Sequence, residues 1–176
     1  MIWIVLALAV LVLPLQWLFA ILLAAFFHEL CHYAAVKACG GQVLRLEIGW
    51  SGAQMEVAGL STGKELLCSL AGPAGGLALL MVIRWIPRTA ICAGFQSLFN
   101  LIPVYPLDGG RALRCGLELI FPLDTVDRVC LWVRKLCLIF MVGLGLYGTV
   151  FLHLGLMPLL LAVVLCGKIA CKPSHH

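Results

Sequence analysis

The sequence predicts an all-α polytopic membrane protein that carries one small β-hairpin. The chain has 176 residues, of which 63% are hydrophobic and only 11% are charged, and its mean hydropathy is +1.09. A soluble domain of this size could not cover its surface with so few charges. Long apolar runs are the second observation, and one glycine-rich stretch of alternating apolar and polar residues is the third. The formal net charge of +4 is therefore read as a topology signal and not as nucleic-acid binding.

The apolar runs predict about five to six transmembrane segments, because a bilayer core needs about 20 helical residues to cross. Pro14 favours a break in the first run, since proline removes a helix hydrogen bond and clashes with the preceding turn. The N-terminal stretch lacks a basic region before its apolar residues, so it resembles a retained anchor more than a cleaved signal peptide. The runs cover residues 2–38, 65–86, 89–107, 136–152 and 154–167.

Residues 40–60 predict a small membrane-associated β-hairpin or sheet. Glycines separate two short stretches, "QVLRLEI" and "AQMEVA", in which apolar and polar residues alternate. This period of two is typical of strands and not of lipid-facing helices. Open strand edges cannot face lipid, so the hairpin should lie at the membrane interface or within the protein.

The basic residues predict the orientation of the chain in the membrane. If the helix that contains His28 runs towards the cytoplasm and each later run crosses once, ten of the twelve basic residues lie inside. The positive-inside rule favours this orientation, which places the histidines towards the cytoplasmic side. The two basic residues outside are Arg84 and Arg88, and the ten inside are Lys37, Arg45, Lys64, Arg111, Arg114, Arg128, Arg134, Lys135, Lys168 and Lys172.

The motif "HELCH" at residues 28–32 places costly ionisable groups in an apolar segment. His28 and His32 are four residues apart, so they lie on one face of a helix and can bind one metal ion. Glu29 is rotated by about 100° and can hold a water molecule at that ion. The pattern predicts a zinc site with Glu29 as the general base. The alternative is that these residues only cap a helix at the interface, but ionisable groups at membrane depth usually mark a functional site.

Asp108 is the candidate for the third zinc ligand. Pro103 and Pro106 end a membrane helix just before "LDGG", and irregular backbone at that depth needs protein or a water-filled cavity around it. The glycines allow a tight turn and close backbone approach, so the carboxylate can reach a neighbouring helix. The alternative is an aspartate that caps the following helix.

These two motifs together resemble the site-2 protease family of intramembrane metalloproteases, whose signatures are HExxH and N-x-x-P-x-x-x-L-D-G. Asn100, Pro103, Leu107, Asp108 and Gly109 match the second signature. The wording "NLIPVYPLDGGRAL" is most similar to the sporulation-type branch of this family, which usually carries a C-terminal CBS domain. The expected organisation of these 176 residues is a single protease domain over residues 1–172, with a catalytic core at about 15–122, a tail at 173–176 and no PDZ or CBS domain. Whether a C-terminal domain is missing or has been removed stays open.

The resemblance also implies a function: a zinc-dependent endopeptidase that cleaves a membrane-associated or transmembrane protein within or near the lipid bilayer. His28, His32 and Asp108 would bind Zn²⁺, Glu29 would be the catalytic base, and Asn100 would contact the substrate. The expected setting is regulated intramembrane proteolysis in a bacterial cell membrane, with a sporulation pro-sigma factor as one substrate and an inhibitory membrane partner. A metal transporter, a metal-binding membrane protein and an inactive chaperone are the rival hypotheses.

Two positions depart from the family pattern. Cys31 stands inside the first motif where the family often has glycine, and it is interpreted as a packing residue, with a thiolate ligand as the alternative. Gly76 stands where many members have asparagine in a G-P-x-x-N pattern, and close helix packing is its leading interpretation. The nine cysteines form no CxxC pair, so the sequence indicates no disulfide framework.

Overall fold

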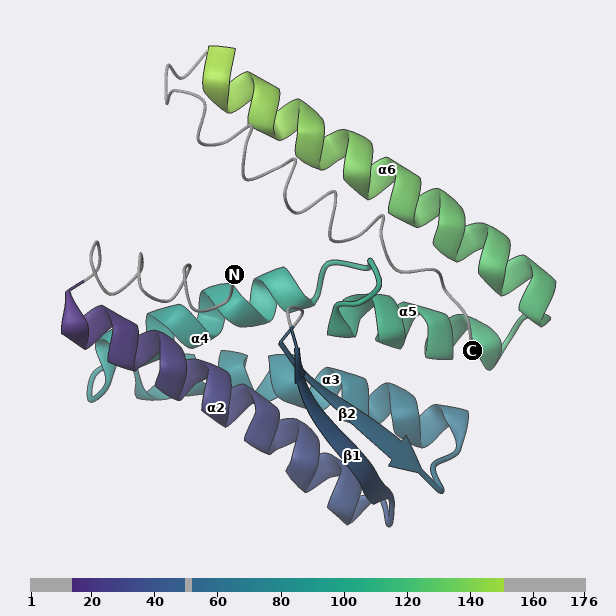
Figure 1. Cartoon of the computed structure of the whole chain (residues 1–176), viewed down its shortest axis with the longest axis horizontal. Helices are drawn as coiled ribbons and strands as arrows, with labels where there is room; N and C mark the ends of the chain where they lie inside the picture. The colour runs from purple at the N-terminus through teal and green to yellow at the C-terminus, as the bar shows by residue number, and fades with distance from the viewer. Residues whose placement is uncertain (1–13, 50–51, 151–176) are drawn as a thin grey trace.

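The computed structural model describes residues 14–49 and 52–150 (Figure 1). These residues form a mostly helical structure with one two-stranded antiparallel sheet, which confirms the predicted fold class. In chain order the elements are α2 (Leu15–Ala38), β1 (Gln42–Gly49), β2 (Gly52–Ala58), α3 (Thr62–Ala78), the 3₁₀ helix η1 (Leu79–Val82), α4 (Pro87–Asn100), α5 (Asp108–Glu118) and α6 (Leu123–Val150).

Helix α2 begins directly after Pro14, where the sequence predicted a helix boundary. The Pro14 carbonyl accepts the backbone N–H of Trp17, so the proline starts the helix without removing a bond from its interior. The helix ends at Ala38, and Gly40 follows with a φ of 80°, a left-handed conformation that glycine adopts without steric cost. The separate segment considered for residues 1–14 lies outside the described residues except for Pro14.

The predicted hairpin is confirmed. Its strands pair Gln42 with Ala58 at one end and Gly49 with Gly52 at the other. The register shifts between Val43 and Arg45, which marks an irregularity near the start of β1. The hairpin occupies the connection between α2 and α3, so it lies next in sequence to the helix that carries both histidines.

Three described helices are long and apolar enough to cross a bilayer: Leu15–Ala38, Thr62–Val82 and Leu123–Val150. Their large apolar side chains are mostly exposed, which a water-soluble surface would not tolerate but lipid accepts. The chain is therefore a multi-pass membrane protein. The segment predicted at 154–167 lies outside the described residues.

Two of the predicted segments have different bounds in the structure. The run at 89–107 corresponds to α4, which starts at Pro87 and ends at Asn100. This helix has 14 residues, so it spans about 21 Å of a core about 30 Å thick. The prolines that follow explain the early end, because the residues before them disfavour helix. The last described helix starts at Leu123 and not near residue 136, and its first turns carry charged residues.

The interior between α2, α3 and α4 is built from small residues. Small side chains let helix backbones approach closely, which is how membrane helices pack without a hydrophobic driving force from water. Three buried polar residues, His28, Thr89 and Ser97, interrupt this apolar interior, and His28 and Ser97 are almost fully buried. The small buried residues are Ala20, Ala24, Gly72, Gly76, Ala90, Ala93 and Gly94.

Candidate metal centre

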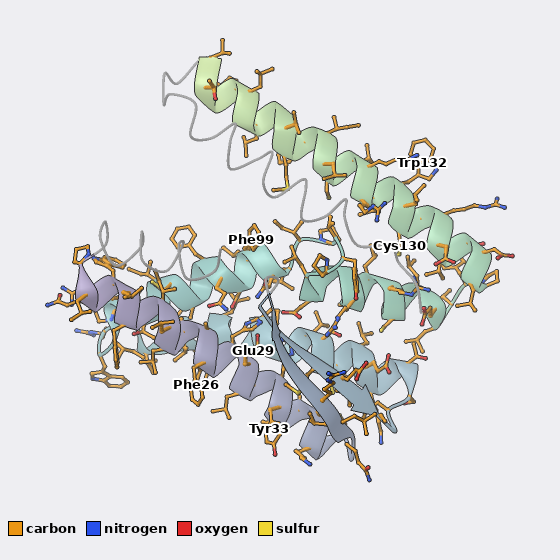
Figure 2. The ribbon with its side chains drawn as sticks, viewed as in Figure 1. Phe26, Glu29, Tyr33, Phe99, Cys130 and Trp132 are labelled. Carbon is orange, nitrogen blue, oxygen red and sulfur yellow. The ribbon has the colours of Figure 1, made fainter. Side chains whose placement is uncertain are left out.

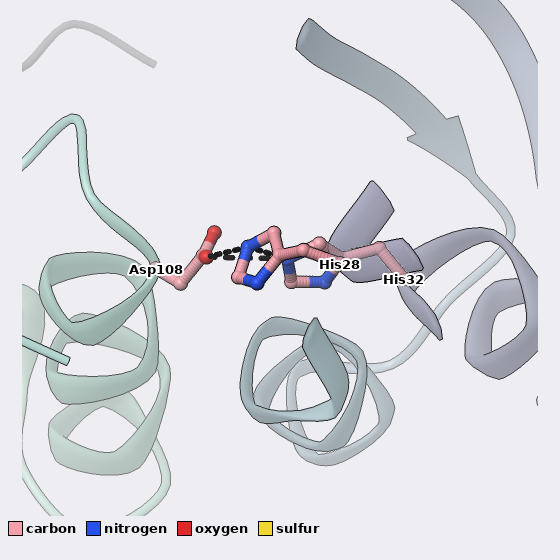
Figure 3. Close-up of side chains that lie close together, drawn as sticks. All are labelled: His28, His32 and Asp108. Atoms are coloured by element: carbon pink, nitrogen blue, oxygen red, sulfur yellow. Dashed lines mark hydrogen bonds and ion pairs between the residues drawn. The ribbon is translucent and has the colours of Figure 1, made fainter. Parts of the chain in front are cut away.

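The two histidines of the first motif face one another on α2. His28 lies ten residues before the end of this helix, about 15 Å along its axis, so the pair is inside a candidate membrane span. Their Nε2 atoms are 3.2 Å apart, and their rings meet edge to face (Figure 3). His28 is 2% exposed and His32 is 13% exposed. The i, i+4 spacing thus converges two imidazole nitrogens, as predicted.

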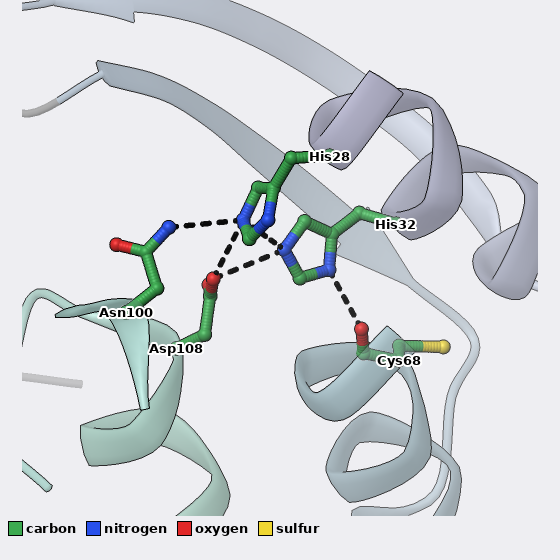
Figure 4. Close-up of polar contacts among 5 residues, drawn as sticks. All are labelled: His28, His32, Cys68, Asn100 and Asp108. Atoms are coloured by element: carbon green, nitrogen blue, oxygen red, sulfur yellow. Dashed lines mark hydrogen bonds and ion pairs between the residues drawn. The ribbon is translucent and has the colours of Figure 1, made fainter. Parts of the chain in front are cut away.

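Asp108 completes the cluster from the first residue of α5. Its Oδ2 lies 3.0 Å from His28 Nε2 and 3.1 Å from His32 Nε2, although 80 and 76 residues separate it from these histidines (Figures 3 and 4). One ligand atom from each of the three residues lies within 4.8 Å of the others. The structure therefore brings together the three residues that the sequence predicted as metal ligands.

The loop between α4 and α5 positions the Asp108 carboxylate. A side chain at Gly109 would collide with the Leu101 carbonyl, and one at Gly110 would collide with the backbone around Val104. The loop folds so tightly over the start of α5 that only glycine fits at these two positions. Asn100 ends α4 just before the loop, and its Nδ2 lies 3.1 Å from His28 Nε2 (Figure 4).

His32 is oriented by a backbone group that the sequence did not reveal. Its Nδ1 donates to the Cys68 carbonyl on α3 at 2.7 Å (Figure 4). A carbonyl can only accept, so the proton of neutral His32 is on Nδ1 and the lone pair of Nε2 points into the cluster. Histidines that bind metals are commonly held by such a bond from the other ring nitrogen. No side-chain pattern could have predicted this partner, because it is main chain.

Hydrogen-bond acceptors of His28, His32 and Asp108 converge at the centre of the cluster. The Asp108 carboxylate is an acceptor, and its Oδ2 faces the Nε2 lone pair of His32. Two acceptors at 3.1 Å need a positive centre between them, either a proton or a metal ion.

Zinc fits this donor set. Two imidazole nitrogens and one carboxylate are typical of catalytic zinc sites, which keep a fourth position open. Ligand atoms around a tetrahedral zinc with bonds of about 2.0–2.1 Å are about 3.3 Å apart. The three separations of 3.0, 3.1 and 3.2 Å are close to that value. The residues present can thus hold the ion that the motifs predicted.

Glu29 lies beside the cluster and is not part of it. It interacts electrostatically with His28, His32 and Asp108, and it is half-buried. Phe26 and Tyr33 project from the outer side of α2, whereas Glu29 lies on the side towards the rest of the bundle (Figure 2). A carboxylate in this place can take a proton from a molecule held at the metal centre without occupying a ligand position.

Cys31 is not among the ligand atoms that cluster in the described residues. Its Sγ packs against Gly75 of α3, so closely that a Cβ on this glycine would collide with the sulfur. This contact agrees with the interpretation of Cys31 as a packing residue. All seven cysteines in the described residues are free thiols.

Gly72 supports His32 from α3, and substitution there should disturb the metal centre. A Cβ at this position would overlap the His32 imidazole. We expect Gly72→Ala to weaken zinc binding by roughly 10- to 100-fold, the range seen when the support of a ligand is removed. Competition with a chromogenic chelator in detergent measures the affinity.

Gly63→Ala is the matched control for this substitution, because Gly63 lies in the first turn of the same helix and a Cβ there meets no atom within 4 Å. Its zinc affinity should equal that of the wild type. Equal affinities in Gly72→Ala and Gly63→Ala would show that the contact with His32 does not hold the ligand in place.

The fold and the cluster define a multi-pass membrane protein with a partly buried His–His–Asp centre of metal-binding type. Comparison with protein-family models finds no match. The chain is similar in sequence to the regulator of sigma-E protease RseP of Escherichia coli (strain K12), with 32% identity over 98 residues. This alignment covers 51% of the chain but only 22% of RseP, so the chain matches about a fifth of that protein's length.

The fold is that of a site-2 protease. The solved structure of the site-2 protease from Methanocaldococcus jannaschii superimposes with a TM-score of 0.69. The match covers 99% of this chain and 88% of the archaeal chain, at 18% sequence identity. This match supports the fold class predicted from the sequence, a helical membrane protein with a small sheet.

Proposed function

We propose that this chain is a zinc-dependent intramembrane endopeptidase of the site-2 protease family. One observation carries the proposal: His28, His32 and Asp108 converge inside the membrane-spanning part of the protein, with Glu29 beside them. The shared fold with a site-2 protease and the sequence similarity to RseP support it. We place the activity in one domain over residues 1–172, with the catalytic core at about 15–122.

The residues of the site have separate roles in the proposed reaction. His28, His32 and Asp108 would hold zinc, which when bound lowers the pKa of water and polarises a carbonyl group. Glu29 takes the proton from the attacking water and delivers it to the leaving amine as the peptide bond breaks. Asn100 donates its amide N–H to the substrate carbonyl oxygen as negative charge develops there. The buried position of the cluster limits access of other water molecules.

The hairpin provides a place for the substrate to bind in an extended form. A two-stranded sheet has an outer edge on each strand, and a sheet edge can pair with an added strand. A transmembrane helix must unwind before its peptide bonds can be cleaved, because helical backbone is hydrogen-bonded to itself. We therefore propose that an unwound segment of a membrane-associated or transmembrane protein pairs with the hairpin near the cluster.

The biological setting proposed here follows from the basic residues and from the branch that the second motif resembles. We place the metal centre towards the cytoplasmic side of a bacterial cell membrane, where the lipid bilayer surrounds the substrate. A membrane-tethered sporulation pro-sigma factor is the first substrate to test, and an inhibitory membrane protein is the expected regulator. The peptidase activity can be measured on a generic transmembrane substrate even when neither the pro-sigma factor nor the inhibitory protein is present in the assay.

Removal of zinc tests the proposal. Dialysis of the purified protein against a strong chelator should abolish cleavage of a co-reconstituted transmembrane substrate, because the water loses its activation. Re-addition of zinc should restore cleavage, and magnesium should not, since it prefers six oxygen ligands. Product formation is followed by mass spectrometry.

Flux measurements separate the peptidase from its main rival, a metal transporter. Zinc uptake into vesicles that contain the protein should not exceed uptake into empty vesicles. Cleavage that survives complete zinc removal would refute the zinc-peptidase assignment, and saturable zinc flux without cleavage would favour transport.

A further inference from the structure

The two histidines of the metal centre differ in the hydrogen bonding of their Nδ1 atoms. His32 Nδ1 donates to the Cys68 carbonyl, whereas His28 Nδ1 has no hydrogen-bond partner among the described residues. Ser97 Oγ is the other buried side-chain atom in the described part of the chain without a partner. His28 is 2% exposed and Ser97 is 0% exposed, so neither can turn to bulk solvent. A buried polar atom without a partner costs free energy, and each instance needs an explanation.

The packing of α2 against α3 fixes the level at which His28 lies. A Cβ on Gly72 would meet His32, whereas a Cβ on Gly75, three residues further along α3, would meet Cys31 and Phe27, which lie one and five residues earlier on α2. Later residues of α3 therefore meet earlier residues of α2, so the two helices run in opposite directions. One turn beyond Gly72 on α3 thus corresponds to one turn before His32 on α2, which is the level of His28.

Ser97 reaches this same level from α4. A Cβ on Gly76, one turn beyond Gly72, would collide with Ser97 Oγ, so the hydroxyl is aimed at this position on α3. Asn100 lies one turn after Ser97 on the same face of α4, and its Nδ2 is 3.1 Å from His28 Nε2. His28 and Ser97 therefore approach one region of the interior from two helices.

The direction of the Ser97 hydroxyl is not explained by its own helix. Serine and threonine inside helices usually bond to the carbonyl four residues earlier. Thr149 does so in α6, where its Oγ1 donates to the Gly145 carbonyl at 2.9 Å. Ser97 makes no such bond in the structure, so its hydroxyl remains available to a group outside α4.

We infer that Ser97 is a positioning residue for His28, and this inference rests on the proposed function. The Nδ1–H of His28 donates to one buried water molecule, which in turn donates to Ser97 Oγ. A water between two buried polar groups is a common way to satisfy both. This chain of bonds keeps the His28 proton on Nδ1 and presents the Nε2 lone pair to the ion, as the Cys68 carbonyl does for His32.

Two substitutions at position 97 separate hydrogen bonding from packing. Ser97→Ala removes the hydroxyl, and Ser97→Cys keeps a similar volume but offers only a weak hydrogen-bonding group. Both variants should bind zinc roughly 10- to 100-fold more weakly than the wild type, as when the outer partner of a metal ligand is lost. The thermal midpoint of the zinc-free protein should stay unchanged in both. Zinc affinity is measured by chelator competition, which does not depend on activity.

Thr89→Val is the matched control, because Thr89 is a buried hydroxyl residue on the same helix, two turns away from Ser97. Its zinc affinity should equal that of the wild type. Wild-type affinity in Ser97→Cys, with or without a loss in Ser97→Ala, would overturn the inference, because packing would then explain the residue. A wild-type protein that binds zinc but cleaves nothing would instead refute the peptidase proposal and leave the role of Ser97 supported by its affinities.

Discussion

Replacement of Glu29 by glutamine should stop proteolysis and leave zinc bound. Glutamine has nearly the same shape as glutamate but cannot accept a proton from water at neutral pH. The lost general base should lower the rate of peptide cleavage by roughly 10²- to 10⁴-fold. The ligand set is untouched, since Glu29 is not among the clustered ligand atoms, so zinc content per protein should stay at the wild-type level. Cleavage is followed on a co-reconstituted substrate, and zinc is measured by atomic emission.

Asp124→Asn is the matched control, because it removes an exposed carboxylate in the first turn of α6, outside the cluster. It should cleave at the wild-type rate. If Glu29→Gln kept more than about a tenth of the wild-type rate, another group would have to act as the base. Comparative membrane proteomics of cells with either variant would then reveal natural substrates, which should accumulate uncut only when Glu29 is replaced.

Replacement of Asp108 by alanine should release the zinc ion. The carboxylate is one of three converging groups and the only one with a full negative charge, and its Oδ2 is within 3.1 Å of both histidines. The loss should exceed the roughly 10- to 100-fold effect of removing an outer partner, because a direct ligand is gone. Cleavage should fall in parallel with zinc occupancy.

Asp124→Ala provides the control for the loss of a carboxylate outside the site. A chelator titration of both variants gives their zinc affinities, and circular dichroism shows whether each keeps its helices. Full zinc occupancy in Asp108→Ala would assign the third ligand to another residue. It would also remove the main geometric support for the peptidase proposal.

The sequence predicted most of the elements that build the site. The alternation in "QVLRLEI" and "AQMEVA" located both strands, because a period of two is unlike a lipid-facing helix. The spacing of His28 and His32 predicted their convergence from helix geometry alone. Asp108 was found because prolines followed by glycines at membrane depth predict irregular backbone that must be buried in protein. Each of these features is encoded within a few neighbouring residues.

Other features depend on contacts between distant parts of the chain and left no local signal. The hydrogen bond from His32 to the Cys68 carbonyl involves main chain, so no residue type marks it. Ser97 is one of many serines that could pack in a helix, and only its burial against Gly76 distinguishes it. The start of α6 at Leu123 was missed because its first turns carry charges, which a search for apolar runs excludes.

The distance along the chain between His28 and Asp108 has a consequence for how the protein is made. The residues that meet at the cluster are 80 positions apart, so a bound ion would close a large loop that includes the hairpin, α3 and α4. Closing this loop lowers the conformational entropy of the unfolded chain, so a bound metal ion would stabilise the helical bundle. The ribosome must synthesise Asp108, the first residue of α5, before all three proposed ligands are present. A metal ion could therefore bind all three residues only after the hairpin, α3, α4 and the start of α5 have been synthesised.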